Sequence, residues 1–181
     1  MSELRKISRR EFMKRTGQAG GGLVFALTFA SACQPDAISV GPAAKASASV
    51  AANVYVNIRN DGVVEIVCHR SEMGQGIRTS LPQIIADELE ANWDKVEVIQ
   101  AVGHETYGDQ NTDGSTSIRK HFDLLRNAGA TARDMMIVAA ASMWAVPADE
   151  CAAREHAVHH EGTGKSAGYG ELVETAIGMP Q

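Results

Sequence analysis

The sequence is poor in cysteine and in aromatic residues. Its 181 residues include three cysteines, and Phe, Trp and Tyr together make up 5% of the chain. So few cysteines exclude a disulfide-rich small fold, and they exclude the four-cysteine ligand sets that hold iron–sulfur clusters. Cys33 lies in the N-terminal segment, so Cys68 and Cys151 remain, either as two free thiols or as one disulfide.

Basic residues are scarce beyond the N-terminal segment. Residues 1–33 contain six of the 17 Lys and Arg residues but only two of the 22 Asp and Glu residues, which leaves 11 basic and 20 acidic residues, a net formal charge of −9. Surfaces that bind nucleic acid need a basic face that neutralises phosphate charge. The charge balance therefore excludes nucleic acid as a partner.

The first 33 residues have the pattern of an export signal. Basic residues precede an apolar run, Gly20 to Ala30, that contains no charge. Ser8-Arg9-Arg10-Glu11-Phe12-Met13-Lys14 resembles the twin-arginine consensus, with Met13 where leucine is usual. The run is shorter than the roughly 20 residues that a membrane span requires, which disfavours a membrane anchor. We therefore expect a twin-arginine signal peptide over residues 1–33 and a periplasmic product.

Two processing products are consistent with the sequence after this signal. Signal peptidase could cut after Ala32, or Cys33 could be lipidated; Ala30 matches the leucine of a lipobox poorly, which favours the soluble product. Residues 34–52 are rich in Ala, Ser and Pro with almost no charge. This composition predicts a flexible linker over residues 34–52 and a folded domain over residues 53–181.

The folded domain opens with strand patterns. Apolar and polar residues alternate over residues 54–58, Asn60-Asp61-Gly62 is typical of a hairpin turn, and residues 63–68 predict the return strand. A helix over residues 77–89 and a strand over residues 96–99 complete a β-β-α-β unit.

Helical spacing dominates the second half. Apolar residues recur at this spacing over residues 122–143, and Pro147 ends the pattern. A strand pair over residues 151–154 and 157–160 and a small helix from Tyr169 follow. We therefore expect an α+β fold, with a small mixed sheet that contains a hairpin and with two or three packed helices.

Histidines and a cysteine near the C-terminus raise the alternative of a zinc site. Cys151, His156, His159 and His160 lie close together in the sequence, with His121 elsewhere. Their spacing fits no standard zinc site. We interpret these histidines as surface residues and expect no metal ligand from the protein.

The first candidate binding loop is residues 70–79, between a strand and a helix. Gly74 and Gly76 permit positive φ and close approach of a ligand, and Gln75 between them carries an amide donor and a carbonyl acceptor. The start of the following helix offers unpaired amides, a natural seat for an anionic or hydrogen-bonding group. A glycine-bounded turn before a helix is also ordinary turn chemistry, so this motif alone does not decide the question.

The second candidate loop, residues 103–117, is long and lacks apolar periodicity, which is uncommon in a compact domain unless the loop has a function. It ends in Gly114-Ser115-Thr116-Ser117, followed by Arg119 and a long helix. Hydroxyl groups, helix amides and Arg119 together suit a phosphate or pyrophosphate group.

The two loops and their helices carry the motifs of a known family in matching order. The motifs are Glu72-Met73-Gly74-Gln75-Gly76-Ile77-Arg78-Thr79, Gln83-Ile84-Ile85-Ala86-Asp87-Glu88-Leu89, Tyr107-Gly108-Asp109-Gln110-Asn111-Thr112-Asp113-Gly114-Ser115 and Gly129-Ala130-Thr131-Ala132-Arg133. From about Asn53 onward the chain resembles the molybdopterin-binding large subunit of the xanthine dehydrogenase and aldehyde oxidase family. It looks most like the periplasmic isoquinoline oxidoreductase β-subunit group.

This resemblance implies a cofactor and the residues that hold it. The implied cofactor is molybdenum with a molybdopterin dinucleotide, commonly the cytosine form, whose dithiolene binds the metal without a protein ligand. In this family the Met-Gly-Gln-Gly motif and the Gly-Ser-x-Ser turn contact the cofactor. The implied cofactor-binding residues are Gly74, Gln75, Gly76, Thr79, Gly114, Ser115, Ser117 and Arg119.

The resemblance also implies a function. It covers the N-terminal portion of a larger subunit, so the general-base glutamate of the family has no counterpart, and neither Glu72 nor Glu105 is assigned that role. The chain is expected to be the cofactor-binding portion of an exported molybdenum hydroxylase or aldehyde dehydrogenase that oxidises an N-heterocycle or an aldehyde with oxygen from water. The implied partners are the remainder of the large subunit, an iron–sulfur small subunit and a cytochrome electron acceptor. The alternative is a truncated, non-catalytic periplasmic fragment with little or no cofactor binding.

Overall fold

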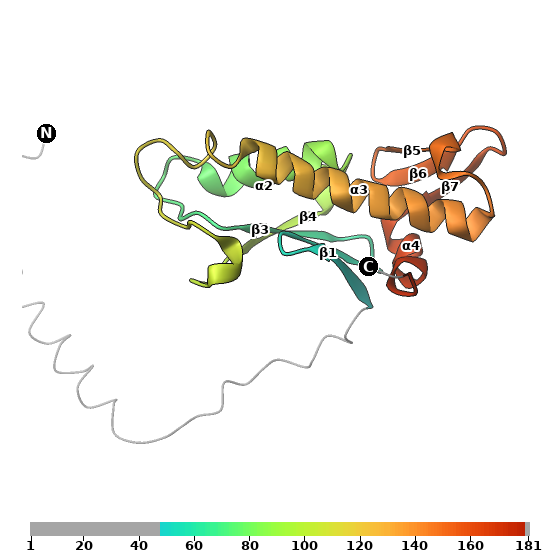
Figure 1. Ribbon diagram of the computed structural model, residues 1–181, viewed down its shortest axis with the longest axis horizontal. Coiled ribbons are helices and arrows are strands. Elements are labelled where there is room, and N and C mark those ends of the chain that lie inside the picture. The colour runs from blue at the N-terminus through green and yellow to red at the C-terminus, as the bar shows by residue number, and fades with distance from the viewer. Residues whose placement is uncertain (1–47, 180–181) are drawn as a thin grey trace, which may run out of the picture. The chain divides into compact units, whose positions relative to one another are not determined.

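The computed structural model of the chain describes residues 48–179, and the expected signal peptide, most of the expected linker and Cys33 lie outside them. The described elements are β1 (Ser49–Asn53), β2 (Val56–Arg59), β3 (Val64–Cys68), α2 (Ile77–Glu88), β4 (Val96–Gln100), α3 (Phe122–Trp144), β5 (Cys151–Arg154), β6 (Ala157–His160), β7 (Lys165–Gly168) and α4 (Tyr169–Ile177). Helices pack against two small sheets (Figure 1), which confirms the expected α+β class.

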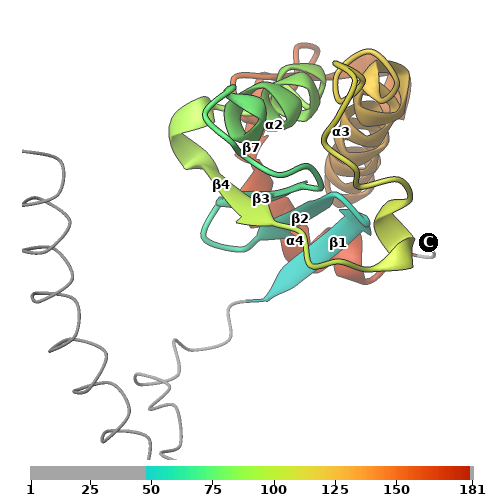
Figure 2. The same ribbon diagram turned by 90° about the vertical axis from the view of Figure 1, so that its left-hand side faces the viewer.

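The larger sheet has the strand order β1-β2-β3-β4. Its first three strands are antiparallel neighbours, whereas β4 runs parallel to β3 after the crossover through α2. Alternate residues of β2 and β3 are buried, as the hairpin pattern predicts. Helices α2 and α3 lie side by side over one face of this sheet (Figure 2). Both candidate loops therefore belong to segments that run into this helical layer.

Strand β1 corrects the expected boundary of the folded domain. Residues 49–52 fall within the stretch predicted as a linker, yet they pair with β2 and place Val50 opposite Ile58. Val50 is 3% exposed. Pairing with a neighbouring strand and burial of one valine outweigh the Ala- and Ser-rich composition, which carries no strand pattern of its own.

The second sheet has the order β5-β6-β7, and all its neighbouring strands are antiparallel. Strands β5 and β6 have the predicted bounds, whereas β7 was not anticipated from the sequence. The long helix α3 ends at Trp144, followed by Ala145 in the left-handed region and then by Pro147, as the sequence predicts. Helix α4 begins at Tyr169, also as predicted.

The interpretation of the C-terminal histidines as surface residues is wrong for two of them. His156 and His160 are buried, at 4% and 3% exposed. The ring of His156 links distant turns, because its Nδ1 accepts from the Asn92 amide at 3.3 Å and its Nε2 contacts the Gly62 carbonyl at 2.7 Å. Cys68 and Cys151 are both buried free thiols.

The described residues contain neither a metal-binding group of side chains nor a membrane-spanning helix. Within residues 48–179, no three or more His, Cys, Asp or Glu side chains are grouped so that they could hold a metal ion. No helix in the same range has the length and apolar character needed to cross a membrane.

Helices α2 and α3 cross closely at Gly129. A Cβ at this position would lie 2.6 Å from the carbonyl oxygen of Ile85 and 2.9 Å from Cβ of Glu88. Near the crossing, Arg126 donates from Nε to the Glu88 carboxylate at 2.9 Å, and Arg133 donates from Nη1 to the Glu88 carbonyl at 2.8 Å. The close approach at Gly129 sets the distance between the two helices.

Substitution Gly129→Ala is expected to lower the free energy of unfolding by about 1 to 3 kcal/mol, because the added methyl group meets backbone atoms that cannot move independently. Urea denaturation of the chain measures the change. Gly103→Ala is the matched control, since a Cβ there meets no heavy atom within 4 Å. Equal unfolding midpoints for the two variants would contradict a close helix crossing.

Candidate functional site

The first loop owes its shape to two left-handed glycines. Gly74 has a φ of 95° and Gly76 a φ of 83°. A Cβ at either position would meet nothing within 4 Å, so glycine is required there by backbone conformation and not by crowding. The loop therefore leaves open space beside its backbone, which a ligand can approach.

The side chain of Gln75 closes this loop on itself. Its Oε1 accepts from the Met73 amide at 2.6 Å, and its Nε2 donates to the Ser71 carbonyl at 3.0 Å. Both halves of the amide group are thus engaged within the loop. Gln75 holds the loop in its turn conformation before any ligand binds.

The carboxylate of Glu72 occupies the start of α2. It accepts from the amides of Gly74 at 2.6 Å, Gly76 at 3.1 Å and Arg78 at 3.0 Å. These hydrogen bonds, that from Arg78 foremost, hold the pKa of Glu72 below its usual value. A carboxylate of the chain thus binds these amides, so an external anionic or hydrogen-bonding group would compete with Glu72 for the start of α2.

The second loop contains a tight turn with two consecutive left-handed residues. Gly114 has a φ of 55° and Ser115, which is not glycine, a φ of 54°. Such strained residues persist where the surrounding structure enforces them, and they concentrate at binding sites. Helix α3 begins only at Phe122, so residues 118–121 separate this turn from the helix, contrary to the expectation that the turn opens the helix directly.

A cavity of about 400 Å³ lies between the two loops. It is lined by Met73, Gln75, Ile77, Ser80, Thr112, Asp113, Gly114, Ser115, Ser117 and Ile118. Of the residues implied by the family resemblance, it brings together Gln75, Gly114, Ser115 and Ser117. Gly74, Gly76, Thr79 and Arg119 are not among the lining residues.

The lining of this cavity combines apolar side chains with hydroxyl groups and carries no positive charge. The apolar side chains are those of Met73, Ile77 and Ile118, the hydroxyl groups come from Ser80, Thr112, Ser115 and Ser117, and the one charged side chain is that of Asp113. Arg119 is exposed and lies outside the lining, so it does not supply the cation expected there. The arrangement suits a ligand held by hydroxyl and amide hydrogen bonds and by backbone that permits close contact.

A second cavity, of about 470 Å³, lies beside the first and shares Ser80 with it. Its other lining residues belong to α2, α3 and the turn after α2, with Trp93 and Phe122 among them. It contains no glycine or serine of the two loop motifs, and it is therefore a groove between the helices and not the candidate site.

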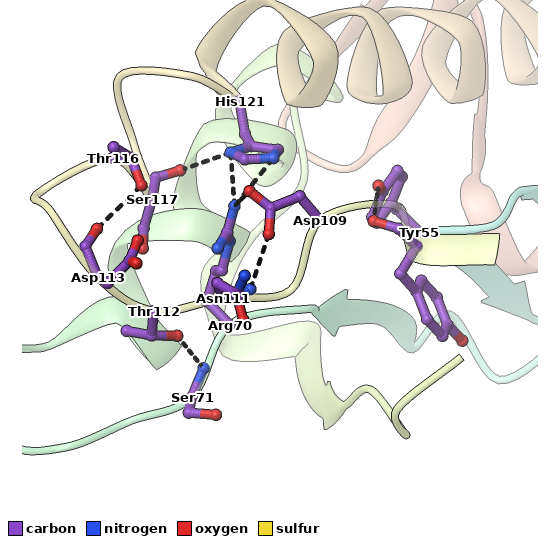
Figure 3. A network of polar contacts seen from close by, with 11 residues as sticks. Tyr55, Arg70, Ser71, Asp109, Asn111, Thr112, Asp113, Thr116, Ser117 and His121 are labelled. Atoms are coloured by element: carbon purple, nitrogen blue, oxygen red, sulfur yellow. Dashed lines mark hydrogen bonds and ion pairs between the residues drawn. The ribbon is translucent and has the colours of Figure 1, made fainter. Parts of the chain in front are cut away.

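A buried polar cluster lies behind the second loop (Figure 3). Arg70, at the end of β3, is fully buried, and its Nη2 lies 3.1 Å from Nε2 of His121 and 3.4 Å from Oδ2 of Asp109. The Ser71 amide donates to Oγ1 of Thr112 at 2.9 Å. Sequence reasoning missed this cluster, because nothing in the pattern around Arg70 or His121 indicates burial.

His69 completes the cluster. Its ring lies between those of Tyr55 and His121, with centroid distances of 5.4 and 4.8 Å, and the residue is 2% exposed. Burial, followed by the proximity of His121 and Arg70, lowers the pKa of His69 to about 4. Neither ring nitrogen has a hydrogen-bond partner among the described residues. His69 is therefore neutral at pH 7.

The sequence of this chain is similar to those of a known family and of several known proteins. Residues 4–180 match the family described as the molybdopterin cofactor-binding domain. The chain is 38% identical to isoquinoline 1-oxidoreductase subunit beta of Brevundimonas diminuta, over 97% of this chain and 23% of that protein. It is 34% identical to the membrane-bound aldehyde dehydrogenase (pyrroloquinoline-quinone) of Gluconacetobacter polyoxogenes, over 66% of this chain and 15% of that protein. The chain thus spans less than a quarter of the length of these relatives.

Among solved structures, the crystal structure of quinoline 2-oxidoreductase from Pseudomonas putida 86 is similar in fold. The TM-score is 0.53, with 21% sequence identity over 68% of this chain and 16% of that chain.

Proposed function

Since the chain belongs to the molybdopterin cofactor-binding domain family, we propose that it is the portion of a molybdenum hydroxylase or aldehyde dehydrogenase that holds a molybdopterin dinucleotide between its two loops. The observation that carries this proposal is the cavity in which Gln75 of the first loop meets Gly114, Ser115 and Ser117 of the second. The family motifs and the geometry thus favour the same place in the fold.

The residues of the cavity fit such a group. Gln75 uses one N–H and one oxygen lone pair of its amide within the loop, so a second N–H and a second lone pair remain for a pterin edge. The hydroxyl groups of Ser115 and Ser117 can donate to phosphate oxygens. The backbone at Gly114, with positive φ and no Cβ, permits close contact. When bound, the cofactor supplies the molybdenum redox chemistry; the chain supplies binding and orientation.

The parent enzyme is proposed to oxidise an N-heterocycle or an aldehyde with oxygen from water. The names of the two curated relatives, one an isoquinoline oxidoreductase and the other an aldehyde dehydrogenase, support these two substrate classes. The cytosine form of the dinucleotide, an iron–sulfur small subunit, the remainder of the large subunit and a cytochrome acceptor belong to the same proposal. So does periplasmic location through twin-arginine export of residues 1–33, with lipidation of Cys33 as the alternative to cleavage.

Metal and nucleotide analysis tests the proposal. The chain is purified from a host that makes molybdopterin dinucleotides, both alone and together with its neighbouring gene products. Stoichiometric molybdenum with a released cytosine nucleotide is the expected result. A folded chain that contains neither in both preparations would overturn the proposal and favour the alternative of a non-catalytic fragment.

The variant Gln75→Ala is expected to weaken cofactor retention. It removes two hydrogen bonds, each worth on the order of 1 kcal/mol, so affinity falls roughly 30-fold. The molybdenum content of the purified chain after dialysis measures the loss. Gln83→Ala is the matched control, because Gln83 is an exposed glutamine of α2 that does not line this cavity. Equal molybdenum retention in the two variants would remove Gln75 from the site.

A further inference from the structure

Arg70 is a fully buried cation whose side-chain hydrogen bonds lead to the second loop and to His121 just after it. Its Nη2 approaches His121 and Asp109, which lie 51 and 39 residues further along the chain. Nε and Nη1 have no hydrogen-bond partner among residues 48–179. Burying a guanidinium group is unfavourable for folding unless its contacts compensate, and an apolar side chain would fill the same space more favourably. Stability alone therefore does not account for an arginine here.

The hydrogen bonds of His121 determine which of its ring nitrogens can accept from Arg70. The Ser117 carbonyl lies 3.2 Å from Nδ1 of His121 and can only accept, so Nδ1 carries the proton. Nη2 of Arg70 lies 3.1 Å from Nε2 of His121 and 3.3 Å from Nδ1. Because Nδ1 carries the proton, Nε2 is the ring nitrogen that has a lone pair to accept from Arg70. A continuous chain of donors thus runs from Arg70 through neutral His121 to the backbone of Ser117, which lines the cavity.

Further hydrogen bonds close to Arg70 involve other residues of the second loop (Figure 3). Asp109, whose Oδ2 faces Arg70 at 3.4 Å, accepts from the Asn111 amide through Oδ1 at 3.0 Å. The Thr112 hydroxyl accepts from the amide of Ser71, the residue after Arg70. The first loop therefore contacts the second loop at Asp109 and Thr112, and contacts His121 just after it.

We propose that Arg70 is a positioning residue that latches the second loop onto the first through neutral His121, and so keeps Ser117 at the cofactor cavity. This inference rests on the proposed function of that cavity. The latch makes the two loops, which come from distant parts of the chain, behave as one binding unit.

The latch depends on pH because it requires the free lone pair of His121. Protonation would turn Nε2 into a donor and would place an imidazolium against the guanidinium of Arg70. His69 and Lys120 also face His121, and within residues 48–179 the negative charge that opposes these groups is that of Asp109. Burial, followed by the charge of Arg70, lowers the pKa of His121. The latch therefore holds at neutral pH and opens in acid.

Amide hydrogen exchange on the full chain without cofactor tests the latch. In Arg70→Gln, the amides of Ser71 and Thr116 are expected to exchange about tenfold faster at pH 7, because hydrogen bonds from a charged group are lost. The exchange rates of amides in β6 and β7 should be the same as in the wild type. Arg70→Lys keeps the charge but not the planar guanidinium group, so its exchange rates should lie between those of the wild type and of Arg70→Gln. Arg154→Gln on the second sheet is the matched control.

The pH dependence of amide exchange distinguishes the latch from a general loss of stability in the loops. In the wild-type chain, exchange at Thr116, corrected for its intrinsic rate, should rise as the pH falls below 6.5, whereas in Arg70→Gln it should be high and flat. His121→Asn, which keeps a donor for Ser117 but has no group at the Nε2 position, should behave like Arg70→Gln and provides a second test if Arg70→Gln does not fold. Unchanged exchange in both variants, or the same pH response as in the wild type, overturns the latch.

Molybdenum content separates this inference from the proposed function. Rapid loss of molybdenum from Arg70→Gln, together with faster loop exchange, supports the latch. Loops that respond as described in a chain that never binds molybdenum would leave the latch standing and overturn the proposed function. Molybdenum bound equally by wild type and Arg70→Gln, with equal exchange, would overturn the latch alone.

Discussion

Lowering the pH from 7 to 4 is expected to destabilise the folded chain by several kcal/mol, with the greatest single contribution from His69. Its pKa lies at about 4 in the folded state, against 6.5 for an unperturbed histidine. A difference of this size corresponds to about 3 kcal/mol. This is a large part of the 5 to 15 kcal/mol by which domains are typically stable.

The direction follows from where protons bind. Between pH 6.5 and 4 the unfolded chain takes up a proton at His69 and the folded chain does not, so stability falls as the pH falls. The pKa values of His121 and His156 are also lowered, in both cases mainly by burial, so they act in the same direction. All of this stability is present above pH 6.5 and is lost progressively towards pH 4.

Urea denaturation at pH 7, 6, 5 and 4 measures the effect. His69→Phe keeps an aromatic ring between Tyr55 and His121 but cannot titrate, so its stability should depend less steeply on pH over this range. His159→Phe is the matched control, because it makes the same substitution at a half-buried histidine outside this cluster. A wild-type curve that is flat from pH 7 to 4 would contradict the buried neutral state of His69.

Tyr169→Ala is expected to lower the free energy of unfolding by about 3 to 5 kcal/mol, as for other large aromatic side chains removed from a core. Tyr169 is fully buried, and its ring lies 4.8 Å from that of His156. Its hydroxyl donates to the Leu89 carbonyl at 2.5 Å. One side chain of α4 thus contacts both the turn between β5 and β6 and the end of α2.

Tyr169→Phe separates the hydrogen bond from the packing. It keeps the ring and leaves the buried Leu89 carbonyl without this donor, so a loss of about 1 to 3 kcal/mol is expected. The half-buried Tyr107 provides the control, because its backbone carbonyl and not its hydroxyl receives the hydrogen bond from Tyr55. Thermal or urea unfolding measures each variant, and equal losses for Tyr169→Phe and Tyr107→Phe would contradict the contact with Leu89.

Elements with a strong local pattern were predictable from the sequence. The turn Asn60-Asp61-Gly62 between two alternating stretches, the periodicity of α3 up to Pro147 and the strand pair after Cys151 all have the predicted type. Each depends on residues that are close together along the chain. Strands β1 and β7 were missed because they are short, contain Ala, Ser or Gly, and form only through pairing with a neighbour.

The candidate site, too, was predictable from the sequence only in its local features. The glycines of both loops and the order of the motifs are visible in the sequence, and they sufficed to indicate a family and a cofactor. The parallel crossover from β3 to β4 and the close approach of α2 and α3 at Gly129 belong to the layer that carries the two loops. That arrangement could not be read from either loop by itself.

By itself, the sequence determined the α+β class, the two glycine-bearing loops and the net negative charge of residues 34–181, because composition and local spacing carry this information. Only the tertiary structure decided that Glu72 already occupies the start of α2, that His156 and His160 are buried, and that Arg70 joins the two loops. Burial and hydrogen bonding depend on residues that are distant in the chain. No local pattern encodes which of them meet.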